Sequence, residues 1–432
     1  MRTSFSGFGG SLLLLSAVAA VAADLPADRF GPADLARLAA LSEPAFSPDG
    51  ATVAYTVTVT NATEDKQQSD LWRVGYDGRD RMQVTSTPKH DESAPAWSPD
   101  GRWLAFLSDR GDDDAQTQVW AMPAGGGEAR VLTNLPGGVH NFQWSPDSQR
   151  LAVIASDPER PAGTPKPKNP PPIVTERWQF KKDVDGYLDA RRSHLYVHDV
   201  ARSESMQITS GDHDEALPAW SPDGRQIAYI TRRGGEPDRH SNFDIYLVEP
   251  RAGATERRLT SFDGADNDPD LESPISWSPD GRQLAFVQGG EDKWIYYAPN
   301  QLAIVDVATG RTRVPAPIDR WFTQPRWSPD GRSVLALIEQ SRVINLSRIE
   351  VASGKVTPLT AGPRFDAGFA VSKQGRIVVL GGDDVTPYQL AALEQGGLRP
   401  LGSHNEWLAQ KKLVRFENIS FRSADGTSID GF

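Results

Sequence analysis

The sequence contains no cysteine among its 432 residues. Disulfide bonds, thiol nucleophiles and cysteine-based zinc sites are therefore excluded, and packing alone must stabilise the fold. Hydrophobic residues make up 38% of the chain and charged residues 24%, which is enough to bury a large core.

Positively charged residues are also fewer than negatively charged ones, since the formal net charge is −11. The basic pairs are scattered along the chain, at Arg191-Arg192, Arg232-Arg233, Arg257-Arg258 and Lys411-Lys412. Nothing resembles a basic stripe that could follow a phosphate backbone. We therefore expect no nucleic-acid partner.

Long apolar runs are missing as well. The run Ser11 to Ala22 is shorter than the roughly 20 residues that cross a bilayer. Arg2 precedes it and small residues end it at Ala23, which is typical of a cleaved export signal. We predict a signal peptide at 1–23, no membrane span after its cleavage, and a periplasmic or secreted mature protein. The alternative is an uncleaved anchor.

Motifs for metals and phosphates are not found either. There is no His-Glu-x-x-His pattern and no phosphate-binding glycine loop. The alternating acids of Asp266 to Glu272 hint at a calcium loop, but Leu271 stands where glycine is needed and Trp277 where glutamate is needed. We expect no metal and no cofactor.

What the sequence does contain is a repeated turn, an aromatic residue followed by Ser-Pro-Asp-Gly. Copies begin at Phe46, Trp97, Trp144, Trp220, Trp277 and Trp327, of which the third has Ser148 in place of glycine, and a degenerate seventh copy begins at Val371. Spacings between the Asp positions, ending at Gln374, are 51, 47, 76, 57, 50 and 44 residues. Such periods indicate a series of similar supersecondary units.

The repeat predicts an all-β fold. Proline presets the first corner of the turn and glycine takes the left-handed exit, so the turn joins two antiparallel strands. Alternating runs such as "RWLAFLS" and "RQIAYIT" follow it, and two further short strands complete most units. We predict a seven-bladed β-propeller of four-stranded blades at 24–404. A β-sandwich is the alternative, but it does not explain one turn repeated seven times. The recurring tryptophan is expected to be a packing residue between blades.

These repeats resemble the propeller of the prolyl oligopeptidase family of serine peptidases, and also TolB-like propellers. Three further stretches resemble the acylaminoacyl-peptidase and dipeptidyl-peptidase branch of that family. They are "FGPADLARLAALSEPAFSPDG" from Phe30, "RWQFKKDVDGYLDARRSHLYVHDV" from Arg177 and "LVRFENISFRSADGTSIDGF" from Leu413.

The resemblance implies a propeller that covers a hydrolase active site and admits only short peptides. It also implies that 405–432 are a linker and the first hairpin of an α/β-hydrolase domain. A catalytic serine of that fold needs Gly-x-Ser-x-Gly, and no such string occurs; the nearest, Gly426 to Gly431, has the wrong spacing. We therefore expect a chain truncated before its catalytic domain, with no catalytic residues and no activity alone. Its expected partners are short peptides and its own missing hydrolase domain. The alternative is a TolB-like propeller that binds and scaffolds envelope proteins.

The step of 76 residues marks a large insertion in the third unit. Its proline-rich first part, Asp157 to Pro172, is expected to be an extended spacer. Its second part is expected to form a hairpin in which Arg177, Trp178 and Tyr187 bind a peptide, the arginine as a fork for a carboxylate or carbonyl and the rings as apolar walls. The alternative is that Arg177 pairs with a local acid such as Asp183 and the rings pack the hairpin.

Acidic loops between the units form a second candidate site, for the amino terminus of a peptide. They contain Asp91-Glu92, Asp212 with Asp214-Glu215, and Asp266 to Glu272. The simpler expectation is that they are solvated loops of an acidic protein.

Overall fold

The computed structural model describes residues 28–112, 115–159, 169, 172–183, 186–294 and 297–432. The predicted signal peptide at 1–23 lies outside these residues. Strands dominate, and the only α-helix in the described ranges is the single turn α1 (Pro32–Leu35). None of the helices described is long and apolar enough to span a bilayer.

Most strands fall into consecutive antiparallel groups, each paired in chain order. The first group comprises β1 (Ala40–Phe46), β2 (Thr52–Asn61), β3 (Lys66–Gly75) and β4 (Met82–Gln83). The second comprises β5 (Glu92–Trp97), β6 (Trp103–Ser108), β7 (Gln118–Pro123) and β8 (Arg130–Val131). The third comprises β9 (Val139–Trp144), β10 (Arg150–Ser156), β13 (Ser193–Asp199) and β14 (Glu204–Gln207). The fourth comprises β15 (Glu215–Trp220), β16 (Ile227–Thr231), β17 (Asp244–Val248) and β18 (Arg257–Arg258).

The later groups follow the same plan. The fifth has a split first strand and comprises β19 (Gly264–Asp266), β20 (Ser276–Trp277), β21 (Gln283–Glu291), β22 (Gln301–Asp306) and β23 (Thr312–Arg313). One parallel pairing, between Ile344 and Phe365, joins the last two groups into one sheet. They comprise β24 (Phe322–Trp327), β25 (Ser333–Gln340), β26 (Val343–Glu350) and β27 (Val356–Pro358), then β28 (Phe365–Val371), β29 (Ile377–Asp383), β30 (Thr386–Glu394) and β31 (Gly397–Pro400).

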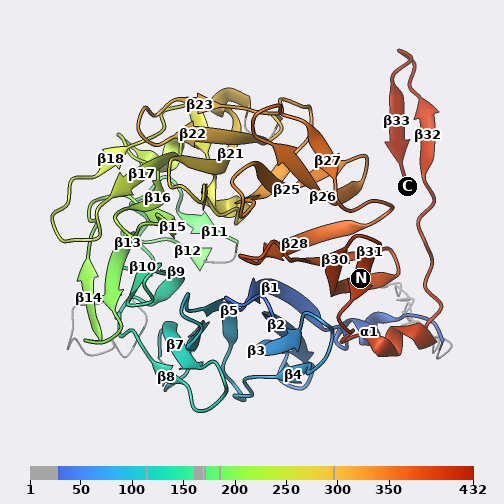
Figure 1. The fold of residues 1–432 in the computed structure, drawn as a ribbon, viewed down its shortest axis with the longest axis horizontal. Coiled ribbons are helices and arrows are strands. Elements are labelled where there is room, and N and C mark those ends of the chain that lie inside the picture. Colours follow the sequence, from blue (N-terminus) through green and yellow to red (C-terminus); the bar gives the residue numbers. More distant parts are fainter. Residues whose placement is uncertain (1–27, 113–114, 160–168, 170–171, 184–185, 295–296) are drawn as a thin grey trace, which may run out of the picture.

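The sheets are arranged around a common centre, and their first strands lie nearest to it (Figure 1). First strands of neighbouring groups contact one another, for example β1 with β5 and β9 with β15, and β28 contacts β1. The hydrophobic core is therefore divided into layers between adjacent sheets, such as the layer of Ala219, Ile230 and Ile245 with Leu284 and Phe286.

The repeated turn has the predicted structure. Gly50 has a φ of 68°, which a residue with a Cβ adopts only with strain. The Ser47 hydroxyl donates to Asp49 Oδ1 (2.5 Å) and accepts the backbone N–H of Thr52 (2.9 Å). Asp49 Oδ1 also accepts the N–H of Ala51 (3.0 Å), so serine and aspartate satisfy the turn's own backbone.

The first and last groups meet without sharing a strand. The hydroxyl of Tyr76 contacts the carbonyl oxygens of Ile377 (3.4 Å) and Leu393 (3.2 Å). Arg376 donates to the carbonyl oxygen of Gly50 (2.8 Å), and Arg399 to that of Tyr76 (2.7 Å). Packing and side-chain hydrogen bonds therefore join the ends of the series.

The segment after β31 packs against the segment before β1. Lys411 Nζ lies 2.8 Å from Asp34 Oδ2, and the amide of Asn405 exchanges hydrogen bonds with the backbone of Ala39 (2.9 and 2.8 Å). Beyond it, β32 (Ile419–Arg422) and β33 (Ser428–Gly431) form a hairpin that stands away from the sheets (Figure 1).

The remaining elements are short. 3-10 turns occupy Pro237–Arg239, Pro269–Leu271, Asp292–Trp294 and Glu406–Gln410. Strands β11 (Lys181–Lys182) and β12 (Gly186–Tyr187) pair with each other inside the insertion of the third group.

Candidate functional site

The insertion between β10 and β13 lies at the end of the sheets opposite to the Ser-Pro-Asp-Gly turns. Each group of four antiparallel strands begins and finishes at this end, so the segment after β31 leaves from it too. The insertion and the C-terminal segment therefore emerge on the same face of the molecule.

Arg177 anchors the insertion hairpin to the fourth group of strands. Its Nε and Nη2 atoms each lie 2.9 Å from a carboxylate oxygen of Asp238, and Nη2 lies 3.3 Å from Asp214. The side chains of Arg177 and Asp238 are 9% and 6% exposed. The hydrogen bond from Arg177 lowers the pKa of Asp238 below its usual value. This is a two-point ion pair removed from solvent.

Two more arginines complete this charge cluster. Arg192, with a side chain 7% exposed, contacts Asp212 (2.8 Å), Asp214 (3.1 Å) and Asp238 (3.5 Å). Arg232 lies 3.4 Å from Asp238 and donates to the carbonyl oxygen of His240 (3.0 Å). Three guanidinium groups thus face three carboxylates, of which Asp238 is shielded, whereas Asp212 is 86% and Asp214 43% exposed.

The rings carried by the anchored hairpin remain in solvent. Trp178 is 66% exposed, Phe180 51% and Tyr187 56%. The guanidinium of Arg239 lies 4.3 Å from the centre of the Trp178 ring, and Lys181 Nζ lies 6.0 Å from that of Tyr187. An exposed aromatic set on a fixed support can bind apolar side chains of a ligand.

The three residues predicted to bind a peptide are therefore divided between two roles. Arg177 is committed to carboxylates from other loops, Asp238 and Asp214, rather than to Asp183 or to solvent. Trp178 and Tyr187 point into solvent beside Phe180, which the sequence reasoning missed. Its place in the alternating run "IVTERWQF", two residues after Trp178, was the available signal.

The acidic loops are divided between the two kinds of environment. Glu92, Glu215 and Asp266 are 0%, 2% and 1% exposed, so these three are neither solvated nor open to a ligand. Asp91, Asp212, Asp270 and Glu272 are exposed, as the simpler expectation has it. Glu215 accepts a hydrogen bond from the hydroxyl of Thr209 (2.7 Å) and forms another with His194 Nδ1 (2.9 Å). The buried acids form part of the packing between strand groups, and the described residues contain no His, Asp and Glu grouping that could hold a metal ion.

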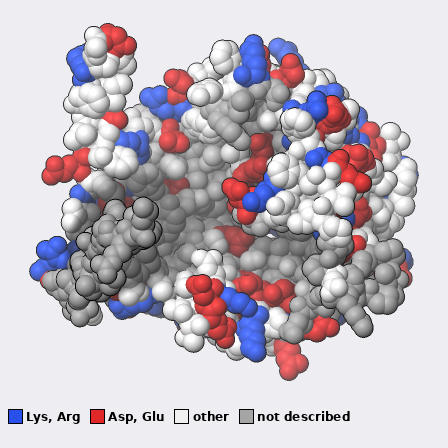
Figure 2. Space-filling model, turned by 180° about the vertical axis from the view of Figure 1, so that it is seen from behind, with Lys and Arg blue, Asp and Glu red and all other residues white. Residues whose placement is uncertain are grey.

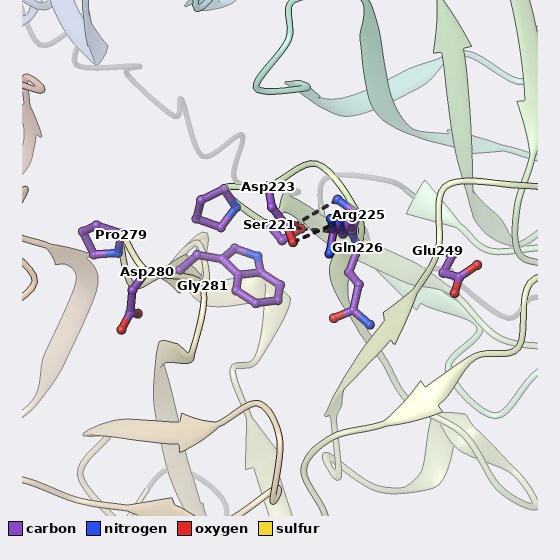
Figure 3. Close-up of a pocket in the computed structure, with 10 residues that line it drawn as sticks. Ser221, Asp223, Arg225, Gln226, Glu249, Pro279, Asp280 and Gly281 are labelled. Carbon is purple, nitrogen blue, oxygen red and sulfur yellow. Dashed lines mark hydrogen bonds and ion pairs between the residues drawn. The ribbon is translucent and has the colours of Figure 1, made fainter.

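A cavity of about 510 Å³ lies on the opposite face, between two of the repeated turns (Figure 3). Its lining includes Gln226, Glu249 and Trp277, with Asp223 and Arg225 close together at one side (Figure 3). The surface seen from behind has Lys and Arg side chains scattered among Asp and Glu (Figure 2). In the cavity the Ser221 hydroxyl donates to Asp223 (2.6 Å), which is the hydrogen bond of the repeated turn itself.

His404, the only histidine after the last repeat, is also occupied. Its Nε2 lies 3.0 Å from the hydroxyl of Tyr55, and its ring meets Trp72 edge-on at 4.6 Å between centres. Burial and the nearby charge of Arg81 lower the pKa of His404 to about 4. The residue therefore fixes the C-terminal segment against the first group of strands.

Comparison with known proteins shows that the repeated sheets are similar to known propeller domains. Residues 37–162 match the family described as PD40, the TolB beta propeller domain. Dipeptidyl-peptidase 5 of Porphyromonas gingivalis is 29% identical over 396 residues, covering 85% of this chain and 54% of that protein.

Two solved structures share the fold. The acylaminoacyl peptidase of Pyrococcus horikoshii superposes with a TM-score of 0.71 at 20% identity, covering 91% of this chain and 57% of that one. The β-propeller domain of the trilobed protease of Pyrococcus furiosus superposes with a TM-score of 0.60 at 18% identity, covering 86% of this chain and 98% of that domain.

The chain spans about half the length of dipeptidyl-peptidase 5, at 54%. The chain is thus a homologue of dipeptidyl-peptidase 5 and matches the β-propeller portion of a serine peptidase of the prolyl oligopeptidase family.

Proposed function

We propose that this chain is the seven-bladed propeller of an exported serine peptidase that acts on short peptides, and that the face carrying the insertion hairpin controls access of the substrate. The seven strand groups would be the blades. The β32–β33 hairpin would begin the α/β-hydrolase domain, and 1–23 would direct export. Without Gly-x-Ser-x-Gly, the 432 residues would bind peptides but not cleave them.

The observation that carries this proposal is the pairing of a buried anchor with exposed rings. Arg177 is held by Asp238 while the adjacent Trp178 stays 66% exposed, so the tryptophan is presented in one orientation. Such pre-organisation reduces the entropy lost when a ligand binds. We assign Trp178 and Tyr187 to substrate contact and Arg177 to positioning them.

Titration of the 432-residue chain with short apolar peptides, followed by tryptophan fluorescence and calorimetry, tests the assignment. Trp178→Ala and Tyr187→Ala should each weaken binding several-fold, because each removes an aromatic contact worth about 0.5–1.5 kcal/mol. Trp294→Ala is the matched control, since Trp294 is also exposed, at 52%, but lies in the fifth group. Equal affinity for all variants would contradict the site.

Turnover provides the second measurement. The isolated chain should not hydrolyse a peptide ester. Hydrolysis that a serine-directed phosphonate abolishes would contradict the proposal that these residues bind peptides without cleaving them. A chain that binds no short peptide would favour the second candidate, a TolB-like propeller that binds envelope proteins. The match of 37–162 to the TolB propeller family is the observation in favour of that candidate.

A further inference from the structure

Arg326 stands on β24, the innermost strand of the sixth group. It is solvent-exposed although its neighbours Pro325 and Trp327 are buried. Burial nevertheless lowers the pKa of Arg326 to about 10. A side chain that reaches solvent and is still desolvated is surrounded by protein on most sides. β24 contacts β20 of the fifth group, so Arg326 stands among the first strands that surround the common centre of the sheets.

No counter-charge accompanies this arginine. Among the described residues, none forms a hydrogen bond or ion pair with Arg326, and no carboxylate contributes to its pKa. Two other shielded arginines, Arg177 and Arg192, each contact at least two aspartates. A cation enclosed without a partner is costly, and an anion from solvent would relieve that cost.

The same position in the other groups is filled by shorter side chains. It is the residue before the aromatic residue of the turn: Ala45, Ala96, Gln143, Ala219, Ser276 and Ala370. Gln143 and Ser276 are engaged, since their side-chain oxygens accept the backbone N–H groups of Trp220 (2.5 Å) and Trp327 (3.1 Å). The alanines end at Cβ, and Ala219 is packed in the layer between the fourth and fifth groups. Arg326 is thus the one cation at this level of the ring, and its donors are free among the residues described.

We propose that Arg326 forms an oxyanion-binding site at the centre of the ring, taking a carboxylate or an inorganic oxyanion such as phosphate. The planar guanidinium can donate two parallel hydrogen bonds to either group, which lysine cannot. This assignment does not depend on the hairpin or on the proposed peptidase function. If the carboxylate is that of a peptide terminus, the site and the proposed substrate class coincide.

Calorimetric titration of the 432-residue chain at low ionic strength and pH 7 tests the site, with three probes: sodium phosphate, trialanine, and trialanine amide. Saturable binding of phosphate or trialanine is expected, and Arg326→Gln should weaken it roughly tenfold or more because a charge-assisted pair is lost. Trialanine amide distinguishes a peptide carboxylate from an inorganic oxyanion as the ligand. If trialanine binds and trialanine amide does not, the ligand of the site is a peptide carboxylate. If phosphate alone binds, the ligand is an inorganic anion.

Arg282→Gln is the matched control, because Arg282 has an 83% exposed side chain next to Asp280 and lies on a turn. It should leave the affinity unchanged. Arg326→Gln should also keep or raise the Tm, since it removes a charge that no protein group balances. Affinity that Arg326→Gln does not change, absence of oxyanion binding, or a Tm lowered by several degrees would overturn the proposal. If Arg326→Gln does not fold, Arg326→Lys replaces it and must bind more weakly than the wild type.

Discussion

The indole Nε1 of Trp144 donates a hydrogen bond to the backbone carbonyl oxygen of Ala96, 3.1 Å away on the neighbouring strand group. Trp97 makes the same bond to Ala45 (3.2 Å) and Trp277 to Ala219 (3.0 Å). At these three turns the tryptophan therefore both fills the space between two sheets and joins them by a hydrogen bond. The bond forms where the preceding group has alanine at the matching position.

Trp327 makes a natural comparison. Its indole nitrogen is buried and has no partner among the residues described, and its backbone N–H donates to Ser276 instead. Trp144→Phe should lower the free energy of unfolding by about 1 kcal/mol more than Trp327→Phe, because only the former loses a made hydrogen bond. Urea denaturation of the two variants measures the difference. Equal losses would mean that the indole bonds contribute nothing beyond packing.

The repeated turns could be predicted because their determinants are local. Ser47 and Asp49 satisfy backbone groups within five residues, so any copy of the motif specifies its own geometry. The partner of Arg177 could not be predicted in the same way. Asp238 lies 61 residues further along the chain, and only the arrangement of the sheets brings the two together. Asp183, the nearby acid, was the natural but incorrect candidate from sequence distance.

The buried acids of these loops can be recognised in the sequence by their spacing from a threonine. The fourth strand of several groups is followed by Leu-Thr or Ile-Thr, and an acid follows six residues later, as in Thr209 with Glu215 and Thr360 with Asp366. A fixed spacing between a hydroxyl and an acid indicates a conserved contact within the repeat rather than a solvated loop. Arg326 had a comparable signal, because it is the only cation at its repeat position.

Thr360→Val should destabilise the protein by about 1 kcal/mol, since it removes a hydrogen bond to the buried Asp366 while the N–H of Leu346 keeps Asp366 as its acceptor (3.1 Å). The Thr360 hydroxyl accepts the N–H of Leu346 (2.9 Å) and donates to Asp366, which is 0% exposed. Thr357→Val is the control, because Thr357 is exposed on β27 of the same group. Chemical denaturation compares the two. A loss for Thr360→Val no larger than that for Thr357→Val would contradict the role of the hydroxyl.

Arg192→Met should cost about 1.5–3 kcal/mol, because it removes charge-assisted hydrogen bonds to Asp212 and Asp214. The shielded Asp238 keeps Arg177 as its partner. The adjacent Arg191 is the control: its side chain is 42% exposed and pairs with Asp189, so Arg191→Met should change stability by under about 1 kcal/mol. Denaturation midpoints give the comparison, and Trp178 fluorescence reports whether the hairpin has moved. A small effect of Arg192→Met on both readouts would show that the cluster does not hold the insertion.

His404 predicts a dependence of stability on pH. Its pKa is lowered from 6.5 to about 4 in the folded chain, so the unfolded chain takes up a proton first as the pH falls. Stability attributable to His404 is therefore present above pH 6.5 and is lost progressively between 6.5 and 4. Because the ring is partly exposed, we expect a loss of about 2 kcal/mol rather than the full value of the shift.

His404→Gln isolates this contribution, since glutamine can still hydrogen-bond the hydroxyl of Tyr55 but does not titrate. Urea denaturation of both proteins at about pH 7.5 and 4.5 should show a smaller pH effect in His404→Gln, while the carboxylates common to both cancel in the comparison. Arg81→Gln should make the pH effect smaller and complete it at a higher pH, because the charge of Arg81 helps to lower the pKa of His404 in the folded chain. If the two proteins instead lose the same stability over this interval, His404 is not the neutral, shielded group that its contacts with Tyr55 and Trp72 describe.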